Sequence, residues 1–399
     1  MTLKVFQTHE HIEGFDATRQ ISFPFDIEPT KFIKTTDFSE ANVIPMKWRG
    51  NNQENENQIK LLKQYNYNNN QLLLFMNLWH VDSLNSFFMK NEYNVYDASI
   101  LRNFRNELGP NCKIAFAHTL KNYTFEKDLL FYDILWNRQK AYFTEYDLYD
   151  LQYRLWTNIA SKKCFHLNPI QKQNDNMRKF LCPNRIYYMD ELIEHPRMYF
   201  RKHLKEFLDS YTNDGYTSNP MKNQILEPEE DGLIEKMKRK ESVGGGEWLP
   251  VANYYYERSY FSVFVETLSV TSHWFTYYKE LQGWNPNHEH SRTITEKTWD
   301  AIIKGHFILP FGYQGLIEDI KSYGFILPDF IDYSYDEEYN DFIRFEKFLT
   351  SLKKLLEIDL SQWQNIYLQY KHILDHNRQL FYDRPYDSLY EKVLPFFDK

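Results

Sequence analysis

The sequence predicts an α/β protein with two Rossmann-like, doubly wound domains that face each other across a cleft, followed by a helical C-terminal tail. Two observations indicate this class. Short apolar runs alternate with helical patterns in each half of the chain, which is typical of parallel βαβ units. The length of 399 residues exceeds what one hydrophobic core usually supports, so two domains are expected.

Composition narrows the class of protein further. Hydrophobic residues make up 42% of the chain, enough for a substantial core, and the net charge of −8 argues against a large basic surface for nucleic acid. The three cysteines are far apart, without a disulfide framework or zinc spacing: Cys112, Cys164 and Cys182. The first residues lack an apolar signal region, and the longest apolar run is too short to span a bilayer. We therefore expect a cytoplasmic protein without a membrane span.

Apolar runs place the strands of the first half. They cover residues 2–8, 41–48, 71–80 and 112–118. The Asn- and Gln-rich segment 50–70 predicts a solvated loop followed by a short helix around "IKLLKQY".

The composition turns polar over residues 171–178, which predicts a domain boundary at about residue 170. The predicted domains are 1–170 and 171–350, with a helical tail at 351–399. In the second domain we expect strands within 179–185, 259–267 and 306–311, and helices within 195–211 and 316–324. The charged, Gly-rich segment 227–246 predicts a solvated insertion loop.

The most informative stretch is "RTITEKTWDAIIKGHFILPFGYQG", residues 292–315. A structural interpretation explains nearly all of it. Thr293 and Glu296 fit a capping box at a helix start, and Gly305 stands where a glycine ends a helix. The buried stripe is Trp299, Ile302 and Ile303. Lys297 is the one residue left without a structural role.

A functional interpretation of the same stretch is open as well. The helix start is expected just beyond the strand that ends at Glu266, where free N–H groups and the helix dipole favour an anion. Lys297 would add a point charge for a diphosphate. Glu266 and Glu296 could accept hydrogen bonds from ribose or sugar hydroxyls, because ionised carboxylates are acceptors only.

Three segments of this region, in order, resemble the donor-binding half of GT-B glycosyltransferases of the fucosyltransferase type. They are "FVET" (264–267), "TEK" (295–297) and "FILPFG" (307–312). The resemblance implies that Glu266, Glu296 and Lys297, with Thr295 in the same motif, hold the ribose and diphosphate of a nucleotide-sugar donor. Segment 264–267 lacks the family's Asn and the connection 268–292 is long. The identities of the sugar and the nucleobase of the donor therefore stay open.

The resemblance extends over roughly residues 179–350 and implies a GT-B-like fold. "KFLCPNR" (179–185) matches a strand of the donor-binding domain, which brings Asn184 and Arg185 close to the donor. Residues 171–350 would then bind the nucleotide-sugar, and residues 1–170 would form the acceptor side.

Candidates for the catalytic base follow predicted strands in the first half. His9, Glu10 and His11 form one set, and His80 with Asp82 forms another. His118 is a third candidate. Each is more often a loop residue that makes hydrogen bonds. His9 and His11 share a strand face and could bind a metal, but the sequence offers no third ligand, so we expect no metal site.

Arg258 precedes the strand that ends at Glu266, and it either reaches a donor phosphate or pairs with a surface acid. The first half holds no Asp-x-Asp motif after a clear strand, which favours a donor site that needs neither metal nor cofactor. The chain also has no Gly-x-Ser-x-Gly, Walker A or Gly-x-Gly-x-x-Gly motif, which weighs against hydrolases, P-loop proteins and classical dehydrogenases.

The expected function is therefore transfer of a sugar from a nucleotide-diphosphate-sugar to a hydroxyl acceptor, most readily a glycan, with inversion preferred through the resemblance. Two alternatives stay open. One is a DNA-modifying glycosyltransferase that acts on a hydroxylated base. The other is a non-catalytic nucleotide- or carbohydrate-binding protein on the same fold.

Overall fold

The computed structural model describes most of the predicted strands and the C-terminal quarter of the chain. The described residues are 1–7, 25, 27–47, 52–76, 98–118, 129–133, 136–137, 140, 172–173, 175–184, 196–218, 253–266 and 294–397. Contacts divide the chain into two compact units. Unit 1 comprises Met1–Arg138, Phe275–Thr293 and Tyr386–Lys399, and unit 2 comprises Gln139–Trp274 and Ile294–Pro385.

Unit 1 is built on a six-stranded sheet in which every pairing is parallel. Its strands are β1 (Leu3–Phe6), β2 (Phe32–Thr35), β3 (Val43–Lys47), β4 (Leu72–Met76), β5 (Lys113–His118) and β6 (Leu129–Phe131). Their order is β2-β1-β3-β4-β5-β6, so the chain reverses direction across the sheet between β1 and β3. This is a doubly wound order, as the alternation of strands and helices predicts.

Both faces of the unit 1 sheet are buried, because successive strand residues point to opposite sides. In β4, Leu73 and Phe75 join one core cluster, whereas Leu72 and Leu74 join the other. The first cluster includes residues of α2 (Asn52–Gln64) and α4 (Ala98–Leu108), and the second includes residues of α15 (Leu389–Val393). Unit 1 also contains two short 3₁₀ helices among its described residues, η1 (Phe38–Glu40) and η6 (Leu394–Phe396).

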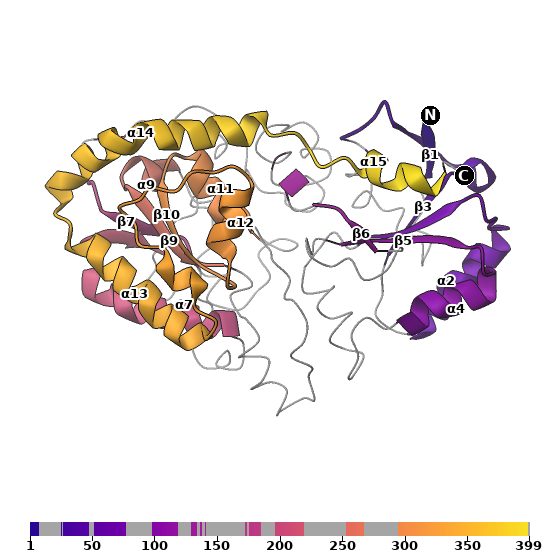
Figure 1. The fold of residues 1–399 in the computed structure, drawn as a ribbon, viewed down its shortest axis with the longest axis horizontal. Helices are drawn as coiled ribbons and strands as arrows, with labels where there is room; N and C mark the ends of the chain where they lie inside the picture. Colours follow the sequence, from indigo (N-terminus) through magenta and orange to yellow (C-terminus); the bar gives the residue numbers. More distant parts are fainter. Residues whose placement is uncertain are drawn as a thin grey trace, which may run out of the picture. The chain divides into compact units, whose positions relative to one another are not determined.

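Unit 2 holds a second parallel sheet, of four strands. They are β7 (Phe180–Cys182), β8 (Gly215–Thr217), β9 (Phe261–Val265) and β10 (Phe307–Phe311), in the order β10-β9-β7-β8. The β7–β8 and β9–β10 crossovers step outwards in opposite directions. Because such crossovers are right-handed, their helices lie on opposite faces of the sheet. This sheet is doubly wound as well, and it reverses between β7 and β9 (Figure 1).

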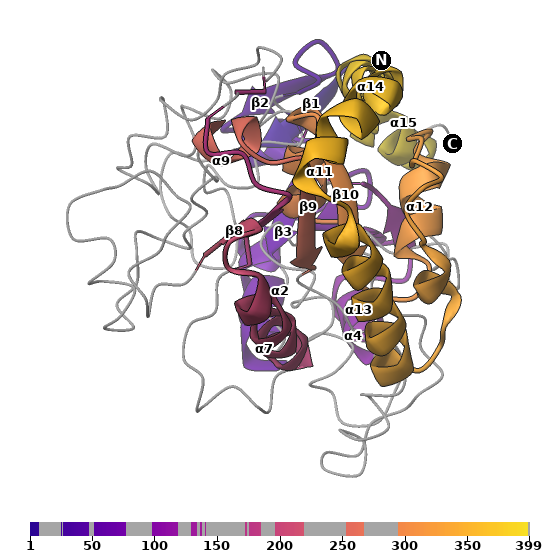
Figure 2. The same cartoon turned by 90° about the vertical axis from the view of Figure 1, so that its left-hand side faces the viewer.

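Aromatic contacts show how the helices of unit 2 cover the sheet. The helices of unit 2 are α7 (Pro196–Leu208), α9 (Asn253–Glu257), α11 (Glu296–Ile303), α12 (Leu316–Ser322), α13 (Asp341–Glu357) and α14 (Leu360–Asp383), with the 3₁₀ helices η3 (Asp209–Tyr211) and η5 (Ser334–Glu337). Phe200 of α7 contacts Phe311 of β10 and Phe345 of α13, at ring-centroid distances of 4.9 and 5.0 Å. Helices α7 and α13 therefore lie side by side on one face (Figure 2). Trp299 of α11 packs instead against Phe381 of α14.

The described structure refines several predicted elements. Helix α2 begins at Asn52, so the Asn-rich segment after residue 51 is helical, where a loop was predicted. Its apolar residues Ile59 and Leu62 pack into the unit 1 core and hold the polar first turns in helical form. The predicted strand 71–80 is strand over Leu72–Met76. Residues 227–246 lie outside the described residues.

Contacts divide the predicted tail 351–399 between the units. Helices α13 and α14 pack in unit 2, whereas Leu389, Tyr390 and Val393 of α15 are buried on the unit 1 sheet. Ser388 and Tyr390 also bind the carboxylate of Glu28 in unit 1. The predicted boundary near residue 170 falls outside the described residues. The cleft between two facing domains stays a prediction.

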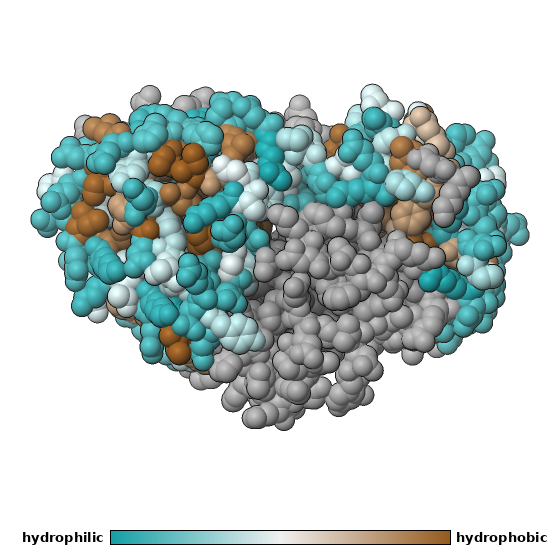
Figure 3. Space-filling view, viewed as in Figure 1, coloured by the Kyte–Doolittle hydropathy of each residue, from teal (hydrophilic) through white to brown (hydrophobic). Residues whose placement is uncertain are grey.

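On the face shown in Figure 3, the described residues are mainly hydrophilic, with apolar residues between polar ones over α13 and α14. Dispersed exposed apolar residues are ordinary on soluble proteins. Among the described helices, none is long and apolar enough to cross a membrane.

Candidate functional site

The carboxyl edge of the unit 2 sheet contains the reversal point between β7 and β9. The chain leaves these neighbouring strands towards opposite faces, so the connections diverge there. In open parallel sheets this is where ligands bind. Asn184 follows the last residue of β7 by two positions, and Glu266 directly follows β9. Both residues were candidates from the sequence, and both lie at this edge of the sheet.

Asn184 joins the two strands where their main-chain pairing ends. Its Nδ2 donates to the Val265 carbonyl at 2.8 Å, and the Val265 N–H donates to its Oδ1 at 2.5 Å. The amide thus behaves like one further residue of the ladder, beyond the last main-chain partners Leu181 and Ser262. Asn184 is buried. Its described hydrogen bonds stabilise the sheet at the reversal point.

Glu266 fixes the start of helix α11. The Glu266 side chain is fully buried and accepts three hydrogen bonds from that helix start. Its donors are the Thr295 N–H at 3.3 Å, the Thr295 hydroxyl, and the Thr298 hydroxyl at 2.6 Å. A carboxylate at this place also interacts favourably with the positive end of the helix dipole. These partners differ from the ribose hydroxyls that the resemblance implied for Glu266.

The helix cap corrects one detail of the sequence analysis. The N-cap of α11 is Thr295, and the Thr295 side chain makes no capping hydrogen bond within the helix. The capping box that began at Thr293 is therefore wrong in register. The physical reason is that Glu266, from the neighbouring strand, takes the place of a local cap. Thr293 and the side chain of Glu296 lie outside the described residues.

Lys297 is the second residue of α11 and is partly exposed. Its Nζ lies 3.4 Å from the Thr295 hydroxyl oxygen, so the ammonium stays close to the first turn. The first N–H groups of a helix have no partner within the helix and favour an anion. The N-terminal turn of α11 and Lys297 together form an arrangement that suits a phosphate group.

The edge beyond β10 holds charged side chains that the sequence analysis missed. Arg344 is fully buried, pairs with Asp341 at 2.5 Å and donates to the Gly312 carbonyl at 2.9 Å. Asp336 accepts from the Ile317 N–H at 2.8 Å, and burial raises its pKa to about 6. Asp341 and Arg344 lie at the start of α13, and Asp336 lies in the 3₁₀ helix η5 before it. The one available signal was the density of acids in "YSYDEEYND".

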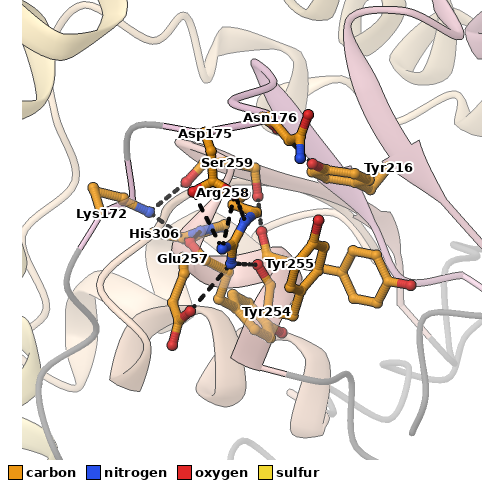
Figure 4. Close-up of polar contacts among 11 residues, drawn as sticks. Lys172, Asp175, Asn176, Tyr216, Tyr254, Tyr255, Glu257, Arg258, Ser259 and His306 are labelled. Atoms are coloured by element: carbon orange, nitrogen blue, oxygen red, sulfur yellow. Dashed lines mark hydrogen bonds and ion pairs between the residues drawn. The ribbon is translucent and has the colours of Figure 1, made fainter. Parts of the chain in front are cut away.

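Arg258 lies at the opposite, amino edge of the sheet (Figure 4). Its guanidinium pairs with Asp175 at 3.2 Å and Glu257 at 3.3 Å, and it stacks on Tyr254 with 4.0 Å from Cζ to the ring centroid. The five-residue strand β9 separates it from Glu266 by about 17 Å, at 3.3–3.4 Å per residue. The structure therefore does not bring Arg258 together with Glu266. Of the two predicted roles, pairing with an acid is the one observed.

Two basic groups at this amino edge, Lys172 and the buried His306, bond to the protein and serve the fold. Lys172 Nζ donates to the carbonyls of Tyr256, at 2.8 Å, and Ser259. Burial lowers the pKa of His306 well below its ordinary value. His306 Nε2 faces the Tyr256 carbonyl at 2.9 Å and so carries the proton, whereas Nδ1 accepts from the Ser262 hydroxyl at 2.9 Å. Ser262 is fully buried inside β9, so this Ser–His pair has no access to substrate.

The remaining predicted site residues are not described. His9, Glu10, His11, His80, Asp82 and Arg185 lie outside the described residues, and His118 ends β5 without a described side chain. Within the described part of the chain, no three His, Cys, Asp or Glu side chains gather as metal ligands would.

Fold and site together define a doubly wound α/β unit with a helix N-terminus fixed at the reversal point of its sheet. The sequence matches no protein-family model and no curated protein. Among solved structures, the chain is similar to the crystal structure of an α1,3-fucosyltransferase, with 11% identity and a TM-score of 0.36. The match covers 99% of this chain and 88% of the fucosyltransferase.

Proposed function

We propose that this protein is a glycosyltransferase that moves a sugar from a nucleotide-diphosphate-sugar donor to a hydroxyl acceptor, with the donor at the carboxyl edge of unit 2. One observation carries the proposal. Glu266, Thr295 and Thr298 fix the start of α11 at the β7–β9 reversal point, with the charge of Lys297 in the same turn. A doubly wound sheet with an anion site at that point is typical of nucleotide-binding domains.

Each residue has a defined role in this proposal. The first N–H groups of α11 and the Lys297 ammonium hold the diphosphate and offset the negative charge that develops as it leaves. Glu266 and Asn184 are positioning residues, because both are buried and bonded to the protein. This revises the ribose-binding role that the resemblance gave to Glu266. The ribose partner would come from elsewhere at the same edge, and Glu296 is the candidate from the sequence.

The chemistry needs a second group. The bond between the anomeric carbon and the phosphate oxygen breaks, the acceptor oxygen forms a bond to that carbon, and a base takes the acceptor proton. The base would come from unit 1, from the sets His9, Glu10 and His11, or His80 and Asp82. In this proposal donor binding needs no metal or cofactor, and the acceptor is a glycan. The sugar configuration is inverted, which the sequence resemblance alone implies.

The first test is a thermal-unfolding panel of nucleoside diphosphates and their sugars. We expect one nucleotide to stabilise the wild type, by about 2.7 kcal/mol at a hundred times its dissociation constant. Lys297→Ala should lose this stabilisation. Lys353→Ala, which removes an exposed lysine of α13, is the matched control and should retain it. A panel without any stabilising nucleotide, or equal shifts in both variants, would overturn the donor site.

A second measurement separates an enzyme from a binding protein. The nucleotide-sugar selected by the panel is incubated with candidate acceptors, and release of nucleoside diphosphate is followed. If the nucleotide-sugar binds but no glycan acceptor leads to release of nucleoside diphosphate, the non-catalytic alternative is favoured. Release that requires DNA with hydroxylated bases would favour the DNA-modifying alternative.

A further inference from the structure

Three tyrosines form a partly exposed surface at the amino edge of the unit 2 sheet. This tyrosine surface consists of Tyr216, on the edge strand β8, and Tyr254 and Tyr255, on the short helix α9 (Figure 4). Tyr254 is 43% exposed. The surface lies at the opposite end of β9 from Glu266, so it is separate from the proposed donor site.

The rings hold one another in fixed orientations. Tyr216 and Tyr254 each meet Tyr255 edge to face, with centroids 5.1 and 5.2 Å apart. The Tyr216 hydroxyl donates to the Asn176 carbonyl at 2.5 Å, and the Arg258 guanidinium covers one face of the Tyr254 ring. Rigid aromatic side chains give a large contact area at little cost in conformational entropy. The tyrosine surface is therefore pre-organised for a ligand.

Charge decides which ligand suits this surface. Arg258 is paired with Asp175 and Glu257, and the main chain of Arg178 bonds to that of Arg258. The formal charges of these two arginines and two carboxylates cancel. A polyanion such as nucleic acid needs a surplus of cations, which these four residues do not supply.

Apolar ring faces beside a carboxylate fit a neutral sugar. The C–H face of a pyranose can pack on a tyrosine ring, and sugar hydroxyls can donate to an exposed carboxylate. Asp175 offers such a group, because its side chain is 61% exposed while it pairs with Arg258. We propose that the tyrosine surface binds a neutral oligosaccharide chain, at a site distinct from the donor site. This inference goes beyond the proposed function and does not depend on it.

Affinity electrophoresis tests the proposal. The full chain is run in native gels that contain dextran, mannan or galactomannan, with a heparin gel as the anionic comparison. We expect at least one neutral polysaccharide to retard the wild type. Tyr254→Ala should weaken this binding at least about tenfold, as loss of a central aromatic contact does. Tyr254→Phe should retain most of it, because the ring remains.

Controls make the outcome decisive. Tyr339→Ala removes a tyrosine that is 54% exposed just before α13, and it should migrate like the wild type. Asp175→Asn, a change on an exposed side chain, should weaken binding without unfolding the protein. Stabilisation by nucleotide should be unchanged in Tyr254→Ala, which separates this site from the donor site. Absence of retardation in every neutral gel, equal retardation of wild type and Tyr254→Ala, or retardation by heparin alone would each overturn the proposal.

Discussion

Replacing Glu266 should destabilise unit 2 by an amount that depends on which hydrogen bonds the new side chain can keep. Glu266→Ala removes the acceptor of three bonds and leaves the Thr295 N–H and the Thr295 and Thr298 hydroxyls without it in a buried place. A hydrogen bond to a charged group contributes about 1.5–3 kcal/mol, but bonds to one carboxylate are not additive. The hydroxyls can also rotate towards other acceptors. We therefore expect a loss of about 3–5 kcal/mol in the free energy of unfolding.

Glu266→Gln should cost much less. The amide oxygen can still accept one bond, and a threonine hydroxyl can turn to accept from the new N–H₂ group. Only the contribution of the charge is lost, so the expected cost is about 1–2 kcal/mol. We therefore expect the free energy of unfolding to increase from Glu266→Ala to Glu266→Gln to the wild type. This order reflects how many hydrogen bonds each side chain at position 266 can accept.

Urea titration followed by tryptophan fluorescence measures these differences, since Trp299 directly follows Thr298 in α11 and is buried. Thr298→Val tests the pairing itself. In a double-mutant cycle with Glu266→Ala, the two changes should be coupled by about 1 kcal/mol or more. Glu318→Gln, an exposed acid of α12, is the control and should stay within about 0.5 kcal/mol of wild type. Equal stabilities for the Ala and Gln variants at position 266 would refute the reasoning.

Other predictions concern the packing and charge of unit 2. Burial raises the pKa of Asp336 from 3.8 to about 6, so the folded state holds its proton more tightly and stability falls as pH rises between these values. Asp336→Asn should flatten that slope in urea titrations at several pH values and stabilise the protein at pH 7.5 by up to about 3 kcal/mol; a steeper slope would contradict this. A Cβ at Gly215 would overlap the Phe180 ring, so Gly215→Ala should lower stability by about 1–3 kcal/mol, and adding Phe180→Leu should recover part of it in thermal unfolding. Arg344→Met leaves Asp341 buried without its cation and should cost about 3–5 kcal/mol, whereas adding Asp341→Leu should restore much of the loss; an equally unstable double variant would argue against the pair.

The fold was largely predictable because its strands are short apolar runs between helical patterns. Strands β1, β3, β4, β5, β7, β9 and β10 lie within predicted segments. Strands β6 and β8 were missed, because each is a three-residue edge strand, and Gly215–Thr217 also has little apolar content. Strand β2 was missed for a similar reason, since Ile33 and Lys34 in its middle are exposed. Short edge strands depend on tertiary pairing more than on local pattern.

The candidate site was predictable only in outline. Position after a strand placed Asn184 and Glu266 at the carboxyl edge, but it could not show that both are bonded to the protein. Thr298 was missed because a threonine inside a helix has no local signal, and its partner is 32 residues away. Arg258 became one candidate for a donor phosphate through its proximity in sequence to β9. A strand runs from one edge of the sheet to the other, so its two ends serve different sites.

The most direct test of the donor site compares the two edges of the unit 2 sheet. The measurement is the rate at which nucleoside diphosphate is released from the selected nucleotide-sugar, for the wild type, Lys297→Ala and Arg258→Ala. We predict that Lys297→Ala lowers the rate about a hundredfold or more, as loss of a charge that stabilises a leaving group does, while Arg258→Ala leaves it nearly unchanged. Loss of release in Arg258→Ala with full activity in Lys297→Ala would place the donor at the amino edge and contradict this account.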